Sequence, residues 1–387
     1  MAPDRLEAAL TILERLISFD TESSKSNLAL VAEVELLLRE RGVDYVKIPN
    51  AAGDKAALFA TIGPMIDGGV VLSGHTDVVP VAGQPWSSDP FRARRADGRV
   101  YGRGACDMKG FDAVALAMIE EFQRAPLRRP IHILFSYDEE TTCLGPVDTI
   151  ARFGKDLPRP GAVIVGEPTM MRVADAHKSV TTHATRVRGV EAHSSMPASG
   201  ANAIETACEL VGEIYRFAET LAAEGGAFGR FDPAGATVAV GVINGGTARN
   251  ILARDCSFLW EYRGLPGAPA DRARRHLDDF VATHVAPKFA ARPHRVEVET
   301  TTEVEIPGLS PEPGSAAETL AFKLARANHA IAVSYATEAG RFQAAGVPTV
   351  VCGPGSIGQA HQPDEYIEVS QIEAGIDFMR ALTRELI

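Results

Sequence analysis

The sequence predicts an α/β protein in which a mostly parallel sheet is interrupted by a smaller inserted α+β domain of the ferredoxin-like type. Three observations support this fold class. Short apolar runs alternate with helical segments in the first part of the chain, apolar and polar residues alternate singly after Lys178, and the first pattern returns after Gly308. Continuous apolar strands that alternate with helices are typical of a parallel sheet covered on both faces.

The first part of the chain contains two predicted helices followed by a series of strands. Apolar residues recur at helical spacing within 6–42, before and after the loop "DTESSKS", which predicts one helix on each side of that loop. The apolar runs that follow predict strands, and one longer segment among them predicts a helix: the strands are 57–62, 69–73, 131–136 and 162–165, and the helix is 111–122.

The middle of the chain predicts the inserted domain. "VTTHATRVRG" and "HRVEVETTTEVEI" alternate like half-exposed antiparallel strands, and between them lie a helix, two strands and a second helix (202–223, 237–243, 255–263 and 270–289). The order β-α-β-β-α-β is ferredoxin-like. The α/β pattern then resumes with a helix near 316–328, a strand at 348–352 and a last helix from Gln371. We expect one domain in two parts, 1–178 and 307–387, around an insertion at 179–306; two tandem domains are the simpler alternative.

Length and charge limit the possible functions. A chain of 387 residues suggests two domains, because single cores stop growing at roughly 250–300 residues. The net charge of −11 argues against nucleic-acid or membrane partners, which favour basic surfaces, and is compatible with a cationic substrate. We expect no membrane span, no secretion signal and, from five scattered cysteines, a cytoplasmic protein with reduced thiols.

Acidic and imidazole side chains recur just beyond the predicted strands or in the glycine-rich turn "YGRGACDMKG". In open α/β sheets, ligand sites form outside the carboxyl ends of the strands. We therefore expect these side chains to converge on one rim: His75, Asp77, Asp107, Glu139, Glu140, Glu167 and His361.

Each of these motifs has an ordinary alternative when taken alone. A histidine at a strand end is more often a hydrogen-bonding residue than a ligand, and "DEE" alone is a solvated strand end. The glycine-rich turn could bind phosphate, yet it lacks a complete dinucleotide-binding or Walker pattern. The recurrence at four strands favours a metal site, and the nitrogen and oxygen ligands favour zinc, with cobalt or manganese as alternatives.

Charge and spacing indicate two ions and a catalytic base. Three carboxylates among the candidate ligands would leave two divalent cations with residual positive charge, which suits an activated water. Glu139, next to the candidate ligand Glu140, could take the proton of that water and pass it to the leaving nitrogen. Asp77, two residues beyond His75, could orient the imidazole ring through its second nitrogen.

Around these residues the chain resembles the superfamily of di-zinc aminoacylases, glutamate carboxypeptidases and succinyl-diaminopimelate desuccinylases, and within it the acetylornithine deacetylase branch. The matching stretches cover both ends and the middle of the chain: "LISFDTESSKSNLAL", "LSGHTDVVPVAGQPWSSDPF", "DGRVYGRGACDMKGFDA", "SYDEE", "VGEPT", "GVEAHSSMPASGANAIE", "NGGTARNI" and "TEAGRFQAAGVPTVVCGPGSIGQAHQPDEY".

The resemblance implies a zinc-exopeptidase-like catalytic domain with two Zn²⁺ per subunit, replaceable by Co²⁺ or Mn²⁺. His75 and Glu167 would hold one ion, Glu140 and His361 the other, and Asp107 would bridge them. Glu139 would be the general base. A cis peptide bond would follow Asp107.

The resemblance also assigns a lid and homodimerisation role to the insertion. His193 would reach the active site of the neighbouring subunit and stabilise the oxyanion, while Asn250 and Arg263 would hold a substrate carboxylate. Glu338 is a candidate partner for a substrate side-chain ammonium. The implied reaction converts N2-acetyl-L-ornithine into L-ornithine and acetate in arginine biosynthesis.

Other functions remain open from the sequence. N-acetylcitrulline or N-succinyl-diaminopimelate could replace the ornithine substrate, or the chain could be a non-catalytic metal-binding relative. A serine hydrolase is disfavoured because the sequence has no G-x-S-x-G motif, and Ser356 lies only in the loop before His361.

Overall fold

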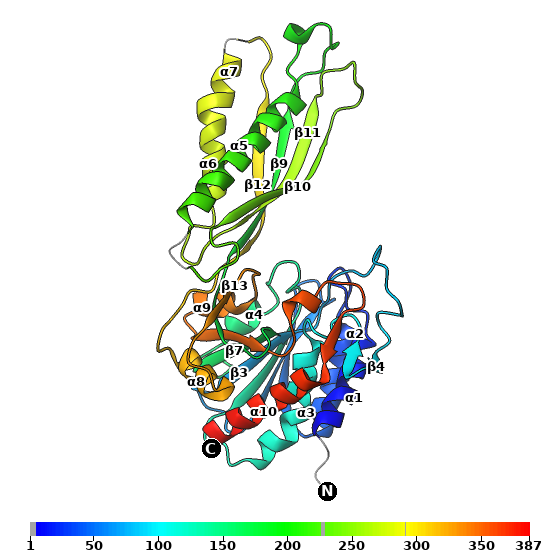
Figure 1. Cartoon of the computed structure of the whole chain (residues 1–387), viewed down its shortest axis with the longest axis vertical. Helices are drawn as coiled ribbons and strands as arrows, with labels where there is room; N and C mark the ends of the chain where they lie inside the picture. The colour runs from blue at the N-terminus through cyan, green and yellow to red at the C-terminus, as the bar shows by residue number, and fades with distance from the viewer. Residues whose placement is uncertain (1–4, 226–228, 291) are drawn as a thin grey trace. The chain divides into compact units, whose positions relative to one another are not determined.

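The computed structural model describes residues 5–225, 229–290 and 292–387, which form two separate units (Figure 1). The first unit contains the described residues of Met1–Ala176, Pro311–Ile331 and Thr337–Ile387. The second contains those of His177–Ser310 and Ala332–Ala336. The chain therefore leaves the first unit, builds the second and returns, with a short segment near residue 334 also assigned to the second unit.

The first unit is built on a sheet whose described strands follow the order β1-β2-β6-β3-β7-β14-β8-β13. Its centre, from β6 to β14, is parallel, whereas β1, β2 and β8 join by antiparallel pairing. This mostly parallel sheet confirms the predicted fold class. The strands are β1 (Asp44–Pro49), β2 (Ala56–Ile62), β3 (Val70–His75), β6 (Ile131–Ser136), β7 (Ala162–Pro168), β8 (Ala174–His177), β13 (Ile331–Val333) and β14 (Thr349–Gly353).

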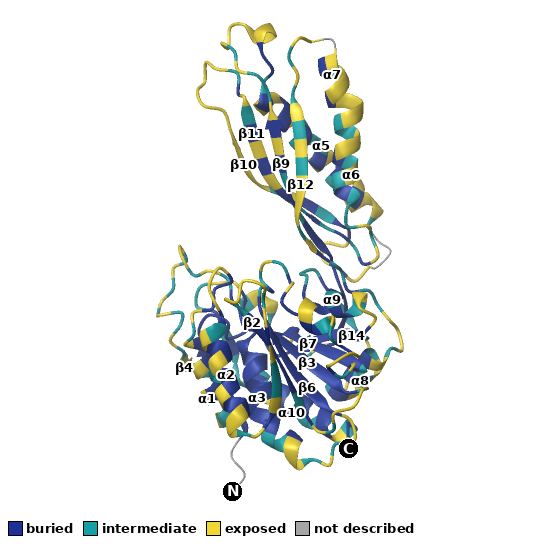
Figure 2. Cartoon of the chain, turned by 180° about the vertical axis from the view of Figure 1, so that it is seen from behind, coloured by how far each residue is buried: buried dark blue, intermediate teal, exposed yellow. Residues whose placement is uncertain are grey.

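Helices cover this sheet, and the most deeply buried of them is α3. Twelve of the 16 residues of α3 are buried because the helix is packed between the sheet and two further helices, α1 and α10. Figure 2 shows the result as dark central strands under helices with exposed outer faces. The helices are α1 (Arg5–Ile17), α2 (Leu28–Glu40), α3 (Lys109–Arg124), α4 (Val147–Ile150), α8 (Ala316–Ala325), α9 (Ala339–Ala344) and α10 (Val369–Glu385).

A small sheet in the same unit was not predicted. It pairs β4 (Arg94–Ala96) with β5 (Arg99–Tyr101), and β5 with β15 (Tyr366–Glu368). The pairing joins the residues that precede Asp107 to those that follow His361. Two segments that carry candidate ligands are thus tied together by backbone hydrogen bonds.

The second unit has the predicted β-α-β-β-α-β order. Its antiparallel sheet follows the order β10-β11-β9-β12, with α5, α6 and α7 packed to form one core with it. The predicted second helix is divided into α6, a π-helical turn and α7. The elements are β9 (Val180–Arg188), α5 (Ala203–Glu224), β10 (Thr237–Gly245), β11 (Asp255–Arg263), α6 (Arg272–Phe280), the π-turn (Val281–Val285), α7 (Ala286–Ala290) and β12 (Glu297–Ile306).

Two further properties concern the cysteines and the hydrophobicity of the helices. All five cysteines are free thiols, and four of them are buried. Among the described residues, no helix combines the length and the hydrophobicity that crossing a membrane requires.

Candidate metal centre and active site

The seven candidate residues of the rim come together in the first unit. His75 is the last residue of β3, Glu167 lies near the end of β7, and Glu139 and Glu140 follow β6. Asp107 occupies the turn before α3, and His361 lies in the loop after β14. Because β3, β6, β7 and β14 are parallel neighbours, their carboxyl ends meet at one edge of the sheet.

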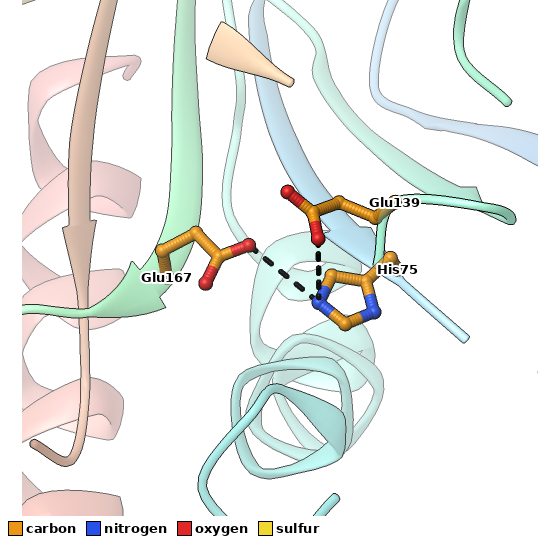
Figure 3. Close-up of side chains that lie close together, drawn as sticks. All are labelled: His75, Glu139 and Glu167. Carbon is orange, nitrogen blue, oxygen red and sulfur yellow. Dashed lines mark ion pairs between the residues drawn. The ribbon is translucent and has the colours of Figure 1, made fainter. Parts of the chain in front are cut away.

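His75 lies at the centre of one group of carboxylates. Its Nε2 atom lies 3.1 Å from Asp107 Oδ1 and 3.5 Å from Glu167 Oε1. Glu139 Oε2 is 3.8 Å from the same nitrogen. Figure 3 shows the carboxylates of Glu139 and Glu167 converging on this side of the ring. Single atoms of these three side chains lie close enough together to hold one ion.

His361 lies beside a second group. Its Nε2 atom is 2.9 Å from Glu140 Oε2 and 3.3 Å from Asp107 Oδ2. The two oxygens of Asp107 therefore face different histidines, one at each end of the cluster. This is the arrangement that a carboxylate shared by two ions requires.

Two glycines make the close packing of this edge possible. A Cβ atom on Gly166, the residue before Glu167, would lie 2.1 Å from the ring of Phe111 on α3. A Cβ atom on Gly74, the residue before His75, would lie 2.0 Å from Asp112 Oδ1. The absent side chains let α3 approach the sheet directly beneath the candidate ligands.

Asp77 does not hold the ring of His75 in the predicted way. The Nδ1 atom of His75 lies 2.9 Å from the backbone oxygen of Asp77, whereas the Asp77 carboxylate is 3.6 Å from it. That carboxylate instead accepts hydrogen bonds from the backbone N–H groups of Glu139 at 3.2 Å and Glu140 at 3.3 Å. Ser23 Oγ donates to it at 2.6 Å. Asp77 therefore orients the ring mainly through its main chain and holds the "DEE" segment through its side chain.

The carboxylates of the cluster repel one another strongly. Burial and the charge of Asp107 raise the pKa of Glu140 to about 7 and that of Glu167 to about 8. Burial and the charge of Glu167 raise the pKa of Glu139 well above its ordinary value. Several carboxylates in one buried site thus destabilise each other's charged forms, a cost that bound cations would remove.

The pKa values of the histidines are raised and that of Asp107 is lowered, so each of these groups favours its charged form. Hydrogen bonds to Asp107 and Glu140 raise the pKa of His361 to about 11. Burial alone would lower the pKa of His75, but Asp107 and Glu167 raise it well above the ordinary value. Burial alone would raise the pKa of Asp107, yet both histidines hold it well below its usual range. The histidines and the carboxylates of the cluster therefore stabilise each other's charged forms.

The donor set fits divalent metal ions. Glu167 Oε1 is buried and makes no hydrogen bond, although a buried carboxylate oxygen normally has a partner. Imidazole nitrogens and carboxylate oxygens, which here lie at the carboxyl ends of the strands, are suitable ligands for zinc and related ions. His75 also forms a second set of neighbouring ligand atoms with Asp107 and Glu140. The two sets share His75 and therefore form one continuous cluster.

Glu338 does not occupy the predicted position for binding a substrate ammonium. Its side chain is 1% exposed, and its two oxygens accept hydrogen bonds from Ser73 Oγ at 2.5 Å and Ser136 Oγ at 2.6 Å. Ser73 lies on β3 and Ser136 on β6. Both carboxylate oxygens therefore accept hydrogen bonds from serines of the sheet, and Glu338 links the neighbouring strands β3 and β6. It is not a substrate-binding residue.

The three remaining candidates lie in the second unit. His193 is exposed, and its segment pairs with that of Asn250, where Ser194 N–H donates to Asn250 O at 3.0 Å. Arg263 ends β11, and its guanidinium contacts Glu261. Asn250 lies five residues before the first residue of β11, whereas Arg263 is the last residue of that strand. The strand itself spans about 27 Å at 3.4 Å per residue. The structure therefore places Asn250 beside His193 and separates both from Arg263.

Further polar residues contact the cluster and were not predicted. Ser23 contacts Asp77, and the thiol of Cys143 lies 3.4 Å from Glu139 Oε1. Glu365 accepts from the backbone N–H of Asp107 at 3.1 Å. The peptide bond Asp107–Met108 is cis, as the resemblance implied. In the sequence, Glu365 follows His361 by only four residues, and that short spacing is the signal that could have identified it.

Comparison with known proteins identifies the family. The sequence matches the model described as peptidase family M20/M25/M40 over residues 71–385. It is 36% identical over 369 residues to an acetylornithine deacetylase of Proteus mirabilis (strain HI4320), covering 94% of this chain and 91% of that protein.

Solved structures share the fold at low sequence identity. A tripeptidase of Staphylococcus aureus superposes with a TM-score of 0.75 at 17% identity, covering 98% of each chain. A dinuclear metal-binding peptidase of the M20 family from Bacillus subtilis superposes with a TM-score of 0.66 at 14% identity, covering 99% of each chain. Sequence and fold agree, and the chain belongs to peptidase family M20/M25/M40.

Proposed function

We propose that this chain hydrolyses the amide bond of N-acyl-L-amino acids, with N2-acetyl-L-ornithine as the substrate and L-ornithine and acetate as the products. The observation that carries the proposal is the position of Asp107 between two histidines: its Oδ1 atom lies 3.1 Å from His75 Nε2 and its Oδ2 atom 3.3 Å from His361 Nε2. The choice of substrate follows the 36% identical acetylornithine deacetylase. By the same analogy we propose a cytoplasmic role in arginine biosynthesis.

Two divalent ions, zinc or in its place cobalt or manganese, would be held by this cluster. We assign His75 and Glu167 to one ion, Glu140 and His361 to the other, and Asp107 to both, since its two oxygens face the two histidines. When bound, such ions polarise a carbonyl group and lower the pKa of a water molecule.

Glu139 is assigned as the general base. Its carboxylate is buried beside His75 Nε2, and the backbone hydrogen bond to Asp77 holds its position. There it would accept a proton from the attacking water and return it to the leaving nitrogen. A binding protein without turnover would be expected to lack this base or a ligand, and this chain has both.

The second unit would complete the site from a neighbouring subunit. Strand β10 lies at the edge of its sheet and exposes the apolar side chains of Val242 and Ile243, and the adjacent β11 exposes Leu259. An exposed apolar edge strand is suited to pairing with a second copy. Since Arg263 lies far from His193 and Asn250 within one chain, a two-fold homodimer would let one subunit supply Arg263 and the other supply His193 and Asn250 to a single site.

A side-by-side assay of purified, zinc-loaded protein tests the substrate. The panel contains the N2-acetyl derivatives of L-ornithine, L-citrulline and L-norvaline together with N-succinyl-L,L-diaminopimelate. We expect the highest kcat/KM for N2-acetyl-L-ornithine, and the norvaline derivative measures the contribution of the side-chain ammonium. A preference for the succinyl compound would assign the desuccinylase reaction instead, and release of no amino acid from any compound would reject the hydrolase proposal.

A further inference from the structure

A buried carboxylate outside the proposed ligand set joins two of the segments that carry ligands. Glu365 is 1% exposed and lies in the loop after β14, four residues beyond His361. Its Oε1 atom accepts hydrogen bonds from the backbone N–H groups of Cys106 at 2.9 Å and Asp107 at 3.1 Å. One side chain of the His361 loop therefore holds the main chain of the turn that carries Asp107.

The second oxygen of Glu365 accepts hydrogen bonds from the same turn. Its Oε2 atom accepts from Arg103 Nη1 at 2.8 Å and from the backbone N–H of Gly104 at 3.2 Å. Four donors thus converge on one buried carboxylate, and all four come from 103–107. Hydrogen bonds to a charged acceptor are stronger than neutral ones, so this contact sets the distance between loop and turn.

Arg103 extends the contact back to the His361 loop. It is 1% exposed, its Nη1 atom also lies 3.4 Å from the backbone oxygen of Gln362, and its guanidinium lies 4.9 Å from the centre of the Trp86 ring. Gln84 accepts a hydrogen bond from Arg103 and donates through Nε2 to the backbone oxygen of His361 at 2.9 Å. The loop is therefore held from both sides.

The conformation of the loop explains why it needs these contacts. His361 has a φ of 61° and Asp364 a φ of 54°. The left-handed region costs a residue with a Cβ atom roughly 1 kcal/mol or more relative to the ordinary helical region. Two such residues within four positions add strain to the loop, and the hydrogen bonds from Gln84 and Arg103 to its backbone oxygens oppose that strain.

We propose that Glu365 is a positioning residue for the metal centre, which holds Asp107 and His361 in register and so forms the pocket for the second ion. The inference rests on the proposed metal-dependent function. Glu365 contacts neither substrate nor ion in this scheme and acts only through the two segments that it joins. The ion assigned to His75 and Glu167 depends on it less, because those residues are placed by β3 and β7.

The test is the binding of Zn²⁺ to metal-free protein, measured by calorimetric titration and checked by the absorption spectrum of bound Co²⁺. The variant is Glu365→Gln, whose amide NH₂ group would face backbone donors in place of an acceptor. We expect one ion to bind as in the wild type and the second to bind 10- to 100-fold more weakly, the usual effect of losing a residue that supports a ligand.

Matched variants make the outcome decisive. Glu368→Gln changes a partly exposed carboxylate, paired with Arg99, and should leave both affinities unchanged. If Glu365→Gln does not fold, Arg103→Lys replaces it, since lysine keeps the charge but cannot reach both Glu365 and Gln84, and the second ion should again be the one affected.

Three results would count against the inference, and they distinguish failure of the positioning role from failure of the proposed two-metal function. Wild-type affinity for both ions in Glu365→Gln, or in Arg103→Lys where it is the variant used, would reject the positioning role. Equal weakening of both ions in a folded variant would show a general structural role and would also reject it. A wild-type protein that binds no second ion would reject the proposed two-metal function itself.

Discussion

The carboxylate of Asp77 accepts a hydrogen bond from the backbone N–H of Glu139 at 3.2 Å. The residue that follows the end of β3 thus fixes the main chain that follows β6, and with it the proposed base. Orientation of the His75 ring depends mainly on the backbone oxygen of Asp77, which lies 2.9 Å from Nδ1.

The first prediction follows from that contact. In Asp77→Asn the amide NH₂ group must face a backbone N–H group, so the "DEE" segment should shift, and kcat should fall about 10- to 100-fold with zinc content retained. Steady-state kinetics and metal analysis measure both effects. Ser23→Ala removes only one donor to Asp77 and should reduce kcat much less. An Asp77→Asn enzyme with wild-type kcat would show that the contact has no catalytic importance.

The second prediction separates the two adjacent glutamates. Glu139→Gln keeps the size of the side chain but cannot accept a proton, so turnover should fall roughly 10²–10⁴-fold while zinc content stays near wild type. Glu140→Gln removes a negative ligand beside His361 and should lose zinc. If metal analysis gave the reverse pattern, the assigned roles of the two residues would be exchanged.

The third prediction concerns removal of metal. Prolonged chelation should abolish hydrolysis, and added zinc or cobalt should restore it, because the proposed mechanism needs the ions to polarise the carbonyl group and to activate the water. The melting temperature should fall on chelation, since ions that bind only the folded state stabilise it. Full activity in a preparation shown to be free of metal would contradict the assignment of the site.

The central fold was predictable because its signals are local. Continuous apolar runs identified β2, β3, β6 and β7, and a change to alternating residues identified the second unit. Strand β1 was missed because its sequence, "DYVKIP", is mostly exposed or half-buried at the edge of the sheet. Edge strands bury too little surface to produce a clear hydrophobic pattern.

The candidate site was predictable where a polar side chain lies at a strand end or in a distinctive motif. His75, Glu139, Glu140 and Glu167 lie at strand ends, whereas Asp107 lies in the glycine-rich turn before α3 and His361 in the loop after β14. The contacts of the Asp77 carboxylate could not be predicted in this way, because they depend on the path of a segment 62 residues away in sequence. Glu338 was assigned wrongly because its carboxylate, in the matching stretch that begins "TEAGRFQ", suggested a partner for a substrate ammonium. The serines within the apolar runs "VVLSG" and "ILFS" were the overlooked signal, since a hydroxyl group in a buried strand needs a partner.

The fourth prediction tests whether subunits share their active sites. His193→Ala should lower kcat about 10²–10³-fold, the usual effect of losing an oxyanion donor, with zinc still bound. A heterodimer of His193→Ala and Glu139→Gln subunits would contain one site with both residues intact, and it should regain a substantial part of wild-type activity. Co-expressed chains with different affinity tags allow the heterodimer to be purified. Heterodimers as inactive as their parents would show that His193 does not act across subunits.

The fifth prediction concerns stability and uses two glycines with opposite surroundings. Gly166→Ala would force a methyl group into the ring of Phe111 and should lower the free energy of unfolding by about 1–3 kcal/mol or more. Gly212 lies within α5, where a Cβ atom would meet only Arg216 Nη1 at 3.6 Å. Gly212→Ala should therefore stabilise the protein by about 0.5–1 kcal/mol. Urea denaturation measures both, and a stabilised Gly166→Ala would contradict the packing described here.

The position of β14 between β7 and β8 has a consequence for synthesis on the ribosome. When β7 leaves the exit tunnel, its neighbour on one side, β3, is already made, but β14 follows only after the whole second unit. The fully buried strand "AVIVGEP" therefore waits with one edge unpaired, and such edges attract other chains. The second unit is contiguous apart from Ala332–Ala336, and that segment also precedes β14, so the unit is complete before β14 is made. The order of translation, rather than the stability of the finished enzyme, thus sets the interval in which the nascent chain must be shielded from aggregation.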